Sequence, residues 1–155
     1  MSQSSVRAGK APVQLASGAV GAVFALVGVL GFVPGITTGY HEMSVLGHQS
    51  HAMLLGLFAV SVLHNVVHLL FGVAGLALAR TPGTARGFLL GGGAVYLVLW
   101  LYGLVVEQSG PANFVPVNTA DNWLHLALGL VMIALGVVTG RGDQSRSVGR
   151  REPST

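Results

Sequence analysis

The sequence contains no cysteine and very little charge. Only 8% of its 155 residues are Asp, Glu, Lys or Arg, whereas 52% are hydrophobic. The absence of cysteine excludes disulfides, iron–sulfur clusters, thiolate metal sites and cysteine nucleophiles. The scarcity of charge excludes an ordinary soluble domain, in which about a quarter of the residues are charged. The composition indicates one apolar domain, and any metal ion in it would need His, Asp or Glu as ligands.

The hydrophobic residues are concentrated in four blocks, each about as long as a membrane-spanning helix. The blocks are approximately residues 13–33, 60–79, 87–106 and 122–139. Because lipid offers no hydrogen-bond partners to the backbone, such blocks cross a bilayer as helices of about 20 residues. The first block exceeds the core of a secretory signal, about 7 to 15 residues, so we interpret it as a retained anchor. The sequence therefore predicts an all-α four-transmembrane-helix bundle.

The segments outside the blocks differ in composition from the membrane domain, which we assign to residues 11–140. Residues 1–10 and 141–155 are rich in Ser, Arg, Gly and Pro and are predicted to be disordered. The loop 34–59 is long, and its second part is apolar. Residues 51–59 either extend the second helix, beginning near His51, or lie along the membrane interface. We favour the longer, tilted helix.

The positive charges predict the orientation. Lys and Arg occur only before the first block, between the second and third, and after the fourth: Arg7, Lys10, Arg80, Arg86, Arg141, Arg146, Arg150 and Arg151. The other two loops contain neither, and hold Glu42, Glu107 and Asp121 instead. Because loops rich in Lys and Arg stay in the cytoplasm, both termini are predicted to be cytoplasmic in a multi-pass plasma-membrane protein.

An internal repeat relates the second and fourth blocks. Both contain the pattern N-x-x-H-L-x-x-G, which begins at Asn65 and again, 57 positions later, at Asn122. The first and third blocks share a weaker string, GAVF from Gly21 and GAVY from Gly93. The repeat predicts two pseudo-symmetric helical hairpins, related by an axis along the membrane normal.

Helical spacing places the polar residues of the repeat on one stripe of each helix, with small residues further along. The outer part of the two stripes forms a predicted polar cluster of Ser61, Asn65, His68, Asn118, Asn122 and His125. Lipid penalises amides and imidazoles, so these stripes should face protein. In the run 118–122, Thr119 or Asp121 is the expected cap of the fourth helix.

The strings LHNVVHLLFGVAGLALAR and PVNTADNWLHLALG, with basic residues closing each hairpin, resemble a family of small bacterial four-helix membrane proteins known only as a domain of unknown function. The likeness covers roughly residues 18–140. It implies the same fold and brings no activity, cofactor or catalytic residue.

The histidines allow three interpretations. Asn and His side chains can act as interhelical hydrogen-bonding groups, each contributing about 0.6 kcal/mol. Alternatively, His64, His68 and His125 bind zinc, copper or haem. A transporter or proton relay is the third interpretation, since ionisable groups within a membrane often serve function. Hydrolysis lacks a base, because Asn65 stands where a zinc protease helix has glutamate.

A further histidine group lies in the outer loop. His41, Glu42, His48 and His51 could form a second metal-binding or pH-responsive cluster, although solvated surface is the more ordinary role of such residues.

No catalytic motif occurs in the sequence, so we expect a non-enzymatic structural or accessory membrane component. Its glycine-rich helix edges favour association with itself or with a larger complex. The basic residues follow membrane topology, and no nucleic-acid partner is expected.

Overall fold

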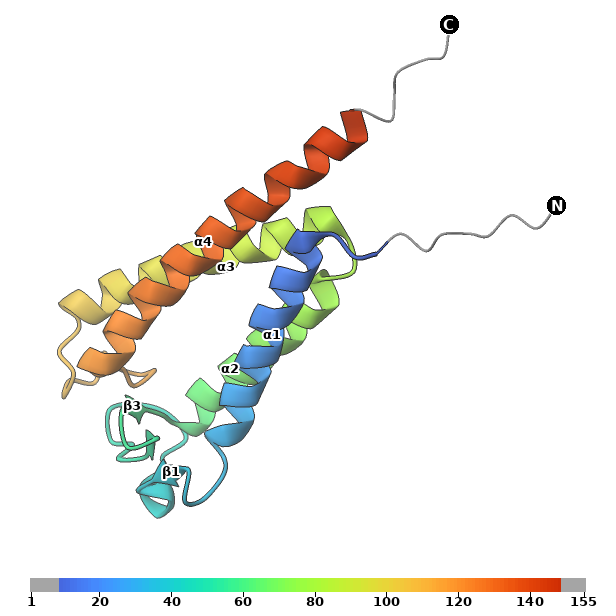
Figure 1. Ribbon diagram of the computed structural model, residues 1–155. Coiled ribbons are helices and arrows are strands. Elements are labelled where there is room, and N and C mark those ends of the chain that lie inside the picture. Colours follow the sequence, from blue (N-terminus) through green and yellow to red (C-terminus); the bar gives the residue numbers. More distant parts are fainter. Residues whose placement is uncertain (1–8, 149–155) are drawn as a thin grey trace, which may run out of the picture.

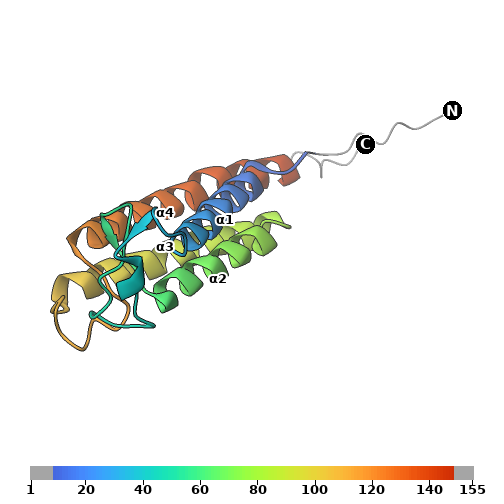
Figure 2. The same cartoon turned by 90° about the horizontal axis from the view of Figure 1, so that it is seen from below.

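Four helices form most of the protein, of which the computed structural model describes residues 9–148. They are α1 (Pro12–Leu30), α2 (Val62–Leu78), α3 (Pro82–Val105) and α4 (Thr119–Val148). Helix α1 pairs with α2 and α3 pairs with α4, and the two hairpins pack together (Figures 1 and 2). The beginning of α1 and the end of α4 lie at one end of the bundle, and a small sheet lies at the other. The tail residues 1–8 and 149–155 lie outside the described residues.

Four α-helices are present within residues 9–148, as predicted, but the long loop between α1 and α2 is not an extension of α2. It forms a short helix, η1 (Tyr40–Glu42), and an antiparallel sheet of β1 (Thr37–Thr38), β2 (Met53–Leu54) and β3 (Phe58–Ala59). Leu55 and Gly56 between β2 and β3 both have positive φ, which ends any helix there. The expectation that the second helix begins near His51 is therefore wrong.

Helix α4 is longer than its apolar block. It continues to Val148, so residues 141–148 are helical where the sequence predicted disorder. The pattern of apolar residues does not reveal where this helix ends. Residues 141–148 are polar, but they contain no proline that would stop the helix.

Glycines bring the paired helices into close contact. A Cβ on Gly21 would lie 2.8 Å from the carbonyl oxygen of Gly72 and 2.7 Å from the nitrogen of Leu76. In the other hairpin, a Cβ on Gly93 would lie 2.9 Å from the oxygen of Gly129 and 3.1 Å from the nitrogen of Ile133. The small residues of the stripes are thus buried at helix contacts, as predicted.

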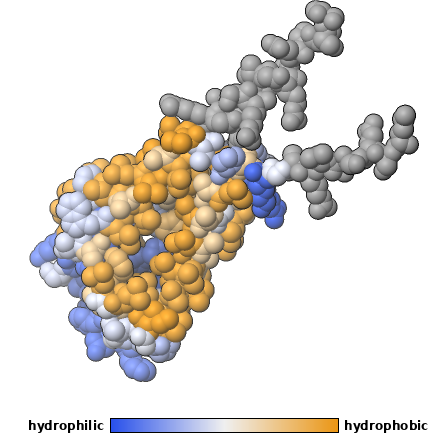
Figure 3. Space-filling model, in the orientation of Figure 1, coloured by the Kyte–Doolittle hydropathy of each residue, from blue (hydrophilic) through white to orange (hydrophobic). Residues whose placement is uncertain are grey.

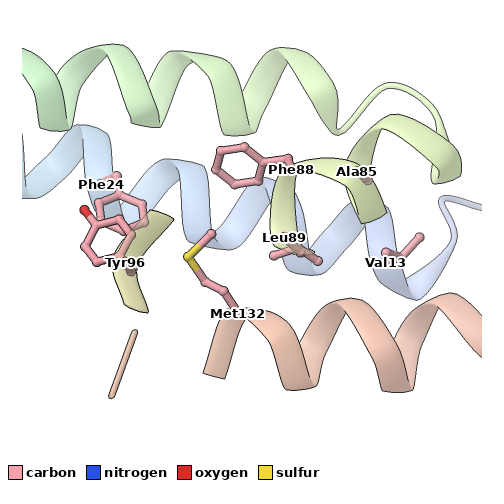
Figure 4. Close-up of a cluster of buried hydrophobic side chains, with 7 residues drawn as sticks. All are labelled: Val13, Phe24, Ala85, Phe88, Leu89, Tyr96 and Met132. Carbon is pink, nitrogen blue, oxygen red and sulfur yellow. The ribbon is translucent and has the colours of Figure 1, made fainter. Parts of the chain in front are cut away.

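Seven apolar residues form a buried core in the part of the bundle nearer the termini. Figure 4 shows them: Val13, Phe24, Ala85, Phe88, Leu89, Tyr96 and Met132. Val13, Ala85 and Leu89 are fully buried. A second, smaller core of Ala52, Leu54 and Val60 joins the sheet to the adjacent end of α1.

The outer surface of the helices is apolar. Large side chains such as Leu26, Leu70, Val98 and Val138 are more than half exposed, and Figure 3 shows this surface as a broad hydrophobic band with hydrophilic residues toward the ends. Within the described chain, α1, α3 and residues Thr119–Gly140 of α4 are long and apolar enough to cross a membrane, and α2 is a shorter apolar helix of 17 residues. Soluble helices bury such surface.

Candidate functional site

The three histidines singled out by the sequence line one cavity. His64 and His68 come from α2, and His125 comes from α4. The cavity has a volume of about 90 Å³, and its other lining residues are Val67, Tyr96, Leu99, Tyr102, Val115 and Val117. Residues four apart share a helix face, which places His64 and His68 on the same wall. The repeat brings His125 to them from the second hairpin.

Aromatic contacts fix the histidine rings. The ring centroids of His64 and His68 are 4.6 Å apart. His68 lies 5.8 Å from Phe24 of α1, and His125 lies 5.3 Å from Tyr96 of α3. Phe24 and Tyr96 are themselves 5.2 Å apart, so one aromatic layer connects the two hairpins.

Each of the three imidazoles has a ring nitrogen without a partner. The Nδ1 atoms of His64, His68 and His125 are buried, and no described residue forms a hydrogen bond with any of them. His64 and His125 are only 4% and 5% exposed. A buried polar atom left without a hydrogen bond costs about 1–3 kcal/mol. The three nitrogens are thus unpaired but enclosed, and the surface of the cavity itself is almost entirely apolar.

The two asparagines of the repeat lie beside glycines of the neighbouring helix. The Asn65 amide packs against Gly31, and the Asn122 amide packs against Gly103. Both amide oxygens are buried without a partner among the described residues, and the Asn65 nitrogen lies 3.8 Å from the sulfur of Met43. Within residues 9–140, the Asn and His side chains of the predicted cluster form no hydrogen bonds to one another.

Ser61 and Asn118 are helix caps. The Oγ atom of Ser61 accepts a hydrogen bond from the backbone nitrogen of His64 at 3.1 Å. The Oδ1 atom of Asn118 accepts from the nitrogen of Asp121 at 3.0 Å, and Asp121 Oδ2 accepts from the nitrogen of Asn118 at 3.0 Å. The N-terminal cap of α4 is thus Asn118, one position before Thr119, which was one of the two expected caps. Asp121, the other, accepts a hydrogen bond from Asn118 in return, so the two residues form a reciprocal pair.

The same two residues attach α4 to the sheet. Asn118 Nδ2 donates to the carbonyl oxygen of Leu57 at 2.8 Å, and Asp121 Oδ2 accepts from the nitrogen of Ala59 at 2.9 Å. Asp121 is only 3% exposed. The six residues of the predicted polar cluster therefore have three different roles. Ser61 and Asn118 cap helices, the amides of Asn65 and Asn122 pack against glycines, and His68 and His125 line the cavity.

Two side chains that the sequence pattern does not single out join α1 to α2 by hydrogen bonds. Gln14 Nε2 donates to the carbonyl oxygens of Ala79 at 3.0 Å and Arg80 at 2.7 Å, and Ser17 Oγ donates to that of Gly75 at 2.9 Å. Both side chains are buried. They lie outside the repeat, and the only available signal was a polar residue on the glycine-rich edge of the first block.

The histidines do not form a metal-binding group as they stand. Among the described residues, no three His, Asp or Glu side chains converge closely enough to hold a metal ion, and this includes the outer-loop residues His41, Glu42, His48 and His51. A volume of about 90 Å³ is also below the roughly 300–1,000 Å³ of typical ligand pockets.

The described residues 9–148 form an all-α fold with four α-helices, three of them long and apolar enough to cross a membrane. The chain matches the model of the family described as Domain of unknown function (DUF4383) over residues 14–138, and it belongs to that family. No curated protein and no solved structure matches the chain significantly.

Proposed function

We propose that this protein is a non-enzymatic accessory component of the plasma membrane, crossing the bilayer four times with both termini in the cytoplasm. The observation that carries the proposal is the distribution of polarity in the helices. Their exposed side chains are apolar, whereas Gln14, Ser17, Asn65, Asn122 and His125 are buried. This arrangement suits a lipid environment, in which polar groups are directed toward protein.

Helix α2 is the shortest span. Its 17 residues extend about 25 Å at 1.5 Å per residue, and the lower limit for a membrane helix is about 17 residues. It lies alongside α1 for most of its length (Figures 1 and 2). A pair of such antiparallel helices crosses the bilayer as a unit, and four crossings return the chain to its starting side.

The charges support a cytoplasmic location for the termini. Lys10, Arg80 and Arg86 belong to the end of the bundle at which α1 begins and α2 leads into α3. The opposite end, with the sheet and the loop after α3, contains no Lys or Arg and holds Glu42 and Glu107. The difference follows the positive-inside rule, and we infer from it that the sheet and the histidine-lined cavity lie in the outer half.

Equivalent contacts support two related hairpins. Gly21 lies against Gly72 and Leu76. Gly93, which is 72 positions after Gly21, lies in the same way against Gly129 and Ile133, which are 57 positions after Gly72 and Leu76. The pairs Phe24–His68 and Tyr96–His125 follow the same two offsets. These correspondences are those expected of a pseudo-two-fold axis between the hairpins.

The buried core favours an accessory role over the alternative of a transporter or proton relay. The apolar residues Val13, Phe88, Leu89 and Met132 pack between the cavity and the end of the bundle that carries the termini. A relay would need hydrogen-bonding groups through this region. Val13, Phe88, Leu89 and Met132 supply none, and the buried Gln14 and Ser17 nearby donate their hydrogen bonds to backbone carbonyl oxygens instead.

Association with a second copy or a larger complex is also part of the proposal. Most glycines of the helices already lie against another part of the same chain. A Cβ added at Gly83, Gly87 or Gly91, however, would have no described neighbour within 4 Å. These three glycines recur every four residues along α3 and would permit close approach of another helix.

Cysteine labelling tests the proposed topology, because the chain has no native cysteine. Single-cysteine variants Glu42→Cys, Gln108→Cys and Gly83→Cys would be treated in intact cells with a membrane-impermeant maleimide. The expected result is labelling at positions 42 and 108, and at position 83 only after permeabilisation. Labelling of position 83 in intact cells, with 42 protected, would contradict the proposal.

A further inference from the structure

The turn between β2 and β3 exposes leucine side chains. Leu55 is 68% exposed and Leu57 is 52% exposed, whereas Leu54 at the end of β2 is buried in the smaller core. An antiparallel hairpin in water commonly directs apolar side chains to the core and polar ones to the solvent. This hairpin is apolar on its exposed side as well, so that side is not adapted to water.

The segment around the turn carries no charge. Residues 52–60 are Ala, Met, Leu, Gly, Phe and Val only, and residues 43–63 contain no Asp, Glu, Lys or Arg. Moving the turn out of water would therefore desolvate no charged side chain. Leu55 has a φ of 55°, a turn conformation that Gly, Asn or Asp usually provides. The chain instead places an apolar side chain at the tip of the turn.

The backbone of the turn is also suited to an apolar environment. The nitrogens of Leu55, Gly56 and Leu57 donate to the carbonyl oxygens of Ile36, Met53 and Leu54, at 2.9, 3.1 and 3.1 Å respectively. Unpaired backbone groups are the main reason why irregular segments are excluded from lipid. The donors of this turn are already paired, so contact with lipid would leave none of these three nitrogens without a partner.

Hydrogen bonds hold the turn at the level where α4 begins. The carbonyl oxygen of Leu57 accepts from Asn118 at 2.8 Å, and Figure 1 shows β3 close to the start of α4. The nitrogen of Ala59 donates to Asp121 at 2.9 Å. Trp123 is two residues further along α4 and is 61% exposed. Tryptophan prefers the boundary between headgroups and acyl chains, which places the turn close to that boundary.

The short helix α2 gives the turn a further role. Its 17 residues span about 25 Å, about 5 Å less than the hydrocarbon core of a bilayer, which is about 30 Å thick. The β2–β3 turn belongs to the segment of chain directly before Val62, the first residue of α2. It supplies apolar surface at the outer end of this short helix.

We propose that Leu55 and Leu57 insert into the outer leaflet, at the boundary between headgroups and acyl chains, and so anchor the loop between α1 and α2 to the bilayer. The partner is the lipid surface itself. Because the turn is uncharged, the contact requires no particular headgroup. The proposal places the β2–β3 turn along the membrane interface, one of the two arrangements that the sequence allowed for residues 51–59. It rests on the proposed function in one respect, namely that the helices span a membrane.

Depth-dependent fluorescence quenching tests the proposal. Single-cysteine variants of the full-length protein would carry an NBD fluorophore in phosphatidylcholine liposomes, with iodide on both sides of the bilayer or with a nitroxide at a shallow or a deep acyl position of the lipid. The label in Leu55→Cys should be quenched most strongly by the shallow nitroxide and only weakly by iodide. The label in Glu42→Cys, an exposed position of the same loop, should be quenched most strongly by iodide. The label in Leu70→Cys, in the middle of α2, should be quenched most strongly by the deep nitroxide.

A matched pair of variants locates the anchor, with the fluorophore in Leu57→Cys as the reporter. Leu55→Asp keeps a residue that tolerates positive φ but adds a charge. Loss of one inserted leucine shifts the turn toward water by at least about tenfold, so iodide quenching should rise toward that at position 42. The control is Val45→Asp, because Val45 belongs to the same loop and is also 68% exposed. Val45→Asp should leave quenching of the reporter unchanged.

Strong iodide quenching at position 55, with position 70 quenched by the deep nitroxide, would overturn the inference and leave the proposed function intact. Protection of position 55 from iodide without quenching by either nitroxide would show that protein covers the turn, and would also overturn the inference. Equal effects of Leu55→Asp and Val45→Asp on the reporter would do the same. Strong iodide quenching at position 70 would contradict the proposed membrane spans and the inference together.

Discussion

The side-chain amide of Asn122 lies directly against Gly103, so a Cβ at position 103 would overlap the amide oxygen. Asn65 lies in the same way against Gly31. Each contact joins the polar end of one helix to its hairpin partner, one turn from a cavity-lining histidine. The repeated asparagine therefore depends on a glycine that the repeat pattern itself does not include.

Substitution of this glycine should destabilise the protein. In Gly103→Ala the new methyl group displaces the Asn122 amide, and overpacking of this kind costs about 1–3 kcal/mol. The matched control is Gly91→Ala on the same helix, where nothing lies within 4 Å of the added Cβ. The control should be neutral or slightly stabilising, since alanine favours a helix by up to about 1 kcal/mol over glycine. Unfolding in mixed detergent and SDS measures both, and equal losses would contradict the close contact.

The hydrogen bonds from α1 to α2 should contribute measurably to stability. Gln14→Leu leaves the carbonyl oxygens of Ala79 and Arg80 without this partner, and Ser17→Ala does the same for Gly75. We expect each substitution to lower the free energy of unfolding by about 1–2 kcal/mol. Gln49→Leu, at an exposed loop position, is the control and should change it little. If neither Gln14→Leu nor Ser17→Ala changed the free energy of unfolding, these hydrogen bonds would make no net contribution to stability.

Asp121 should hold the sheet against the bundle. Its Oδ2 atom accepts hydrogen bonds from the backbone nitrogens of Ala59 and Asn118. In Asp121→Leu both bonds are lost, so the Ala59 amide should exchange with deuterium at least about tenfold faster, as expected for a loss of about 1.5 kcal/mol. Glu42→Leu alters a carboxylate of the loop that makes no such bond and should leave the rate unchanged. Equal exchange rates at Ala59 in the two variants would refute this role.

Metal analysis tests the zinc, copper or haem alternative for the three cavity histidines. Because no three ligating side chains converge within the described chain, we expect the purified protein to carry less than one metal ion per chain and no Soret absorption. Stoichiometric metal that disappears in His68→Ala would support the alternative, and would require the imidazoles to move together.

The helical architecture follows from the sequence because each helix separates apolar side chains on one side from small and polar residues on the other. Small and polar residues at steps of three and four, such as Gly72 and Gly75, were predicted to face protein, and both are buried. The repeat also predicted that His68 and His125 approach one region, and both line the same cavity. Periodicity carries this information because a helix has a fixed pitch.

Other features depend on contacts that periodicity does not encode. The turn between β2 and β3 needs Leu55 at a φ of 55°, a conformation that leucine rarely adopts. The cap of α4 is Asn118, whose Nδ2 atom also donates to the carbonyl oxygen of Leu57, 61 residues away. The role of Gln14 is only weakly indicated for the same reason, since its partners Ala79 and Arg80 lie at the end of α2 and in the turn after it.

The central claim is that lipid surrounds the helices and that their polar stripes face inward. Spin labels at Val66, Leu70 and Val73, which are 38%, 65% and 60% exposed on α2, test it without disturbing the buried face. In liposomes, collision with molecular oxygen should be frequent at these three positions, and collision with a water-soluble nickel chelate should be rare. A label at Glu42 should show the reverse. Frequent collision with the nickel chelate at positions 66, 70 and 73 would place this face in water and contradict the account.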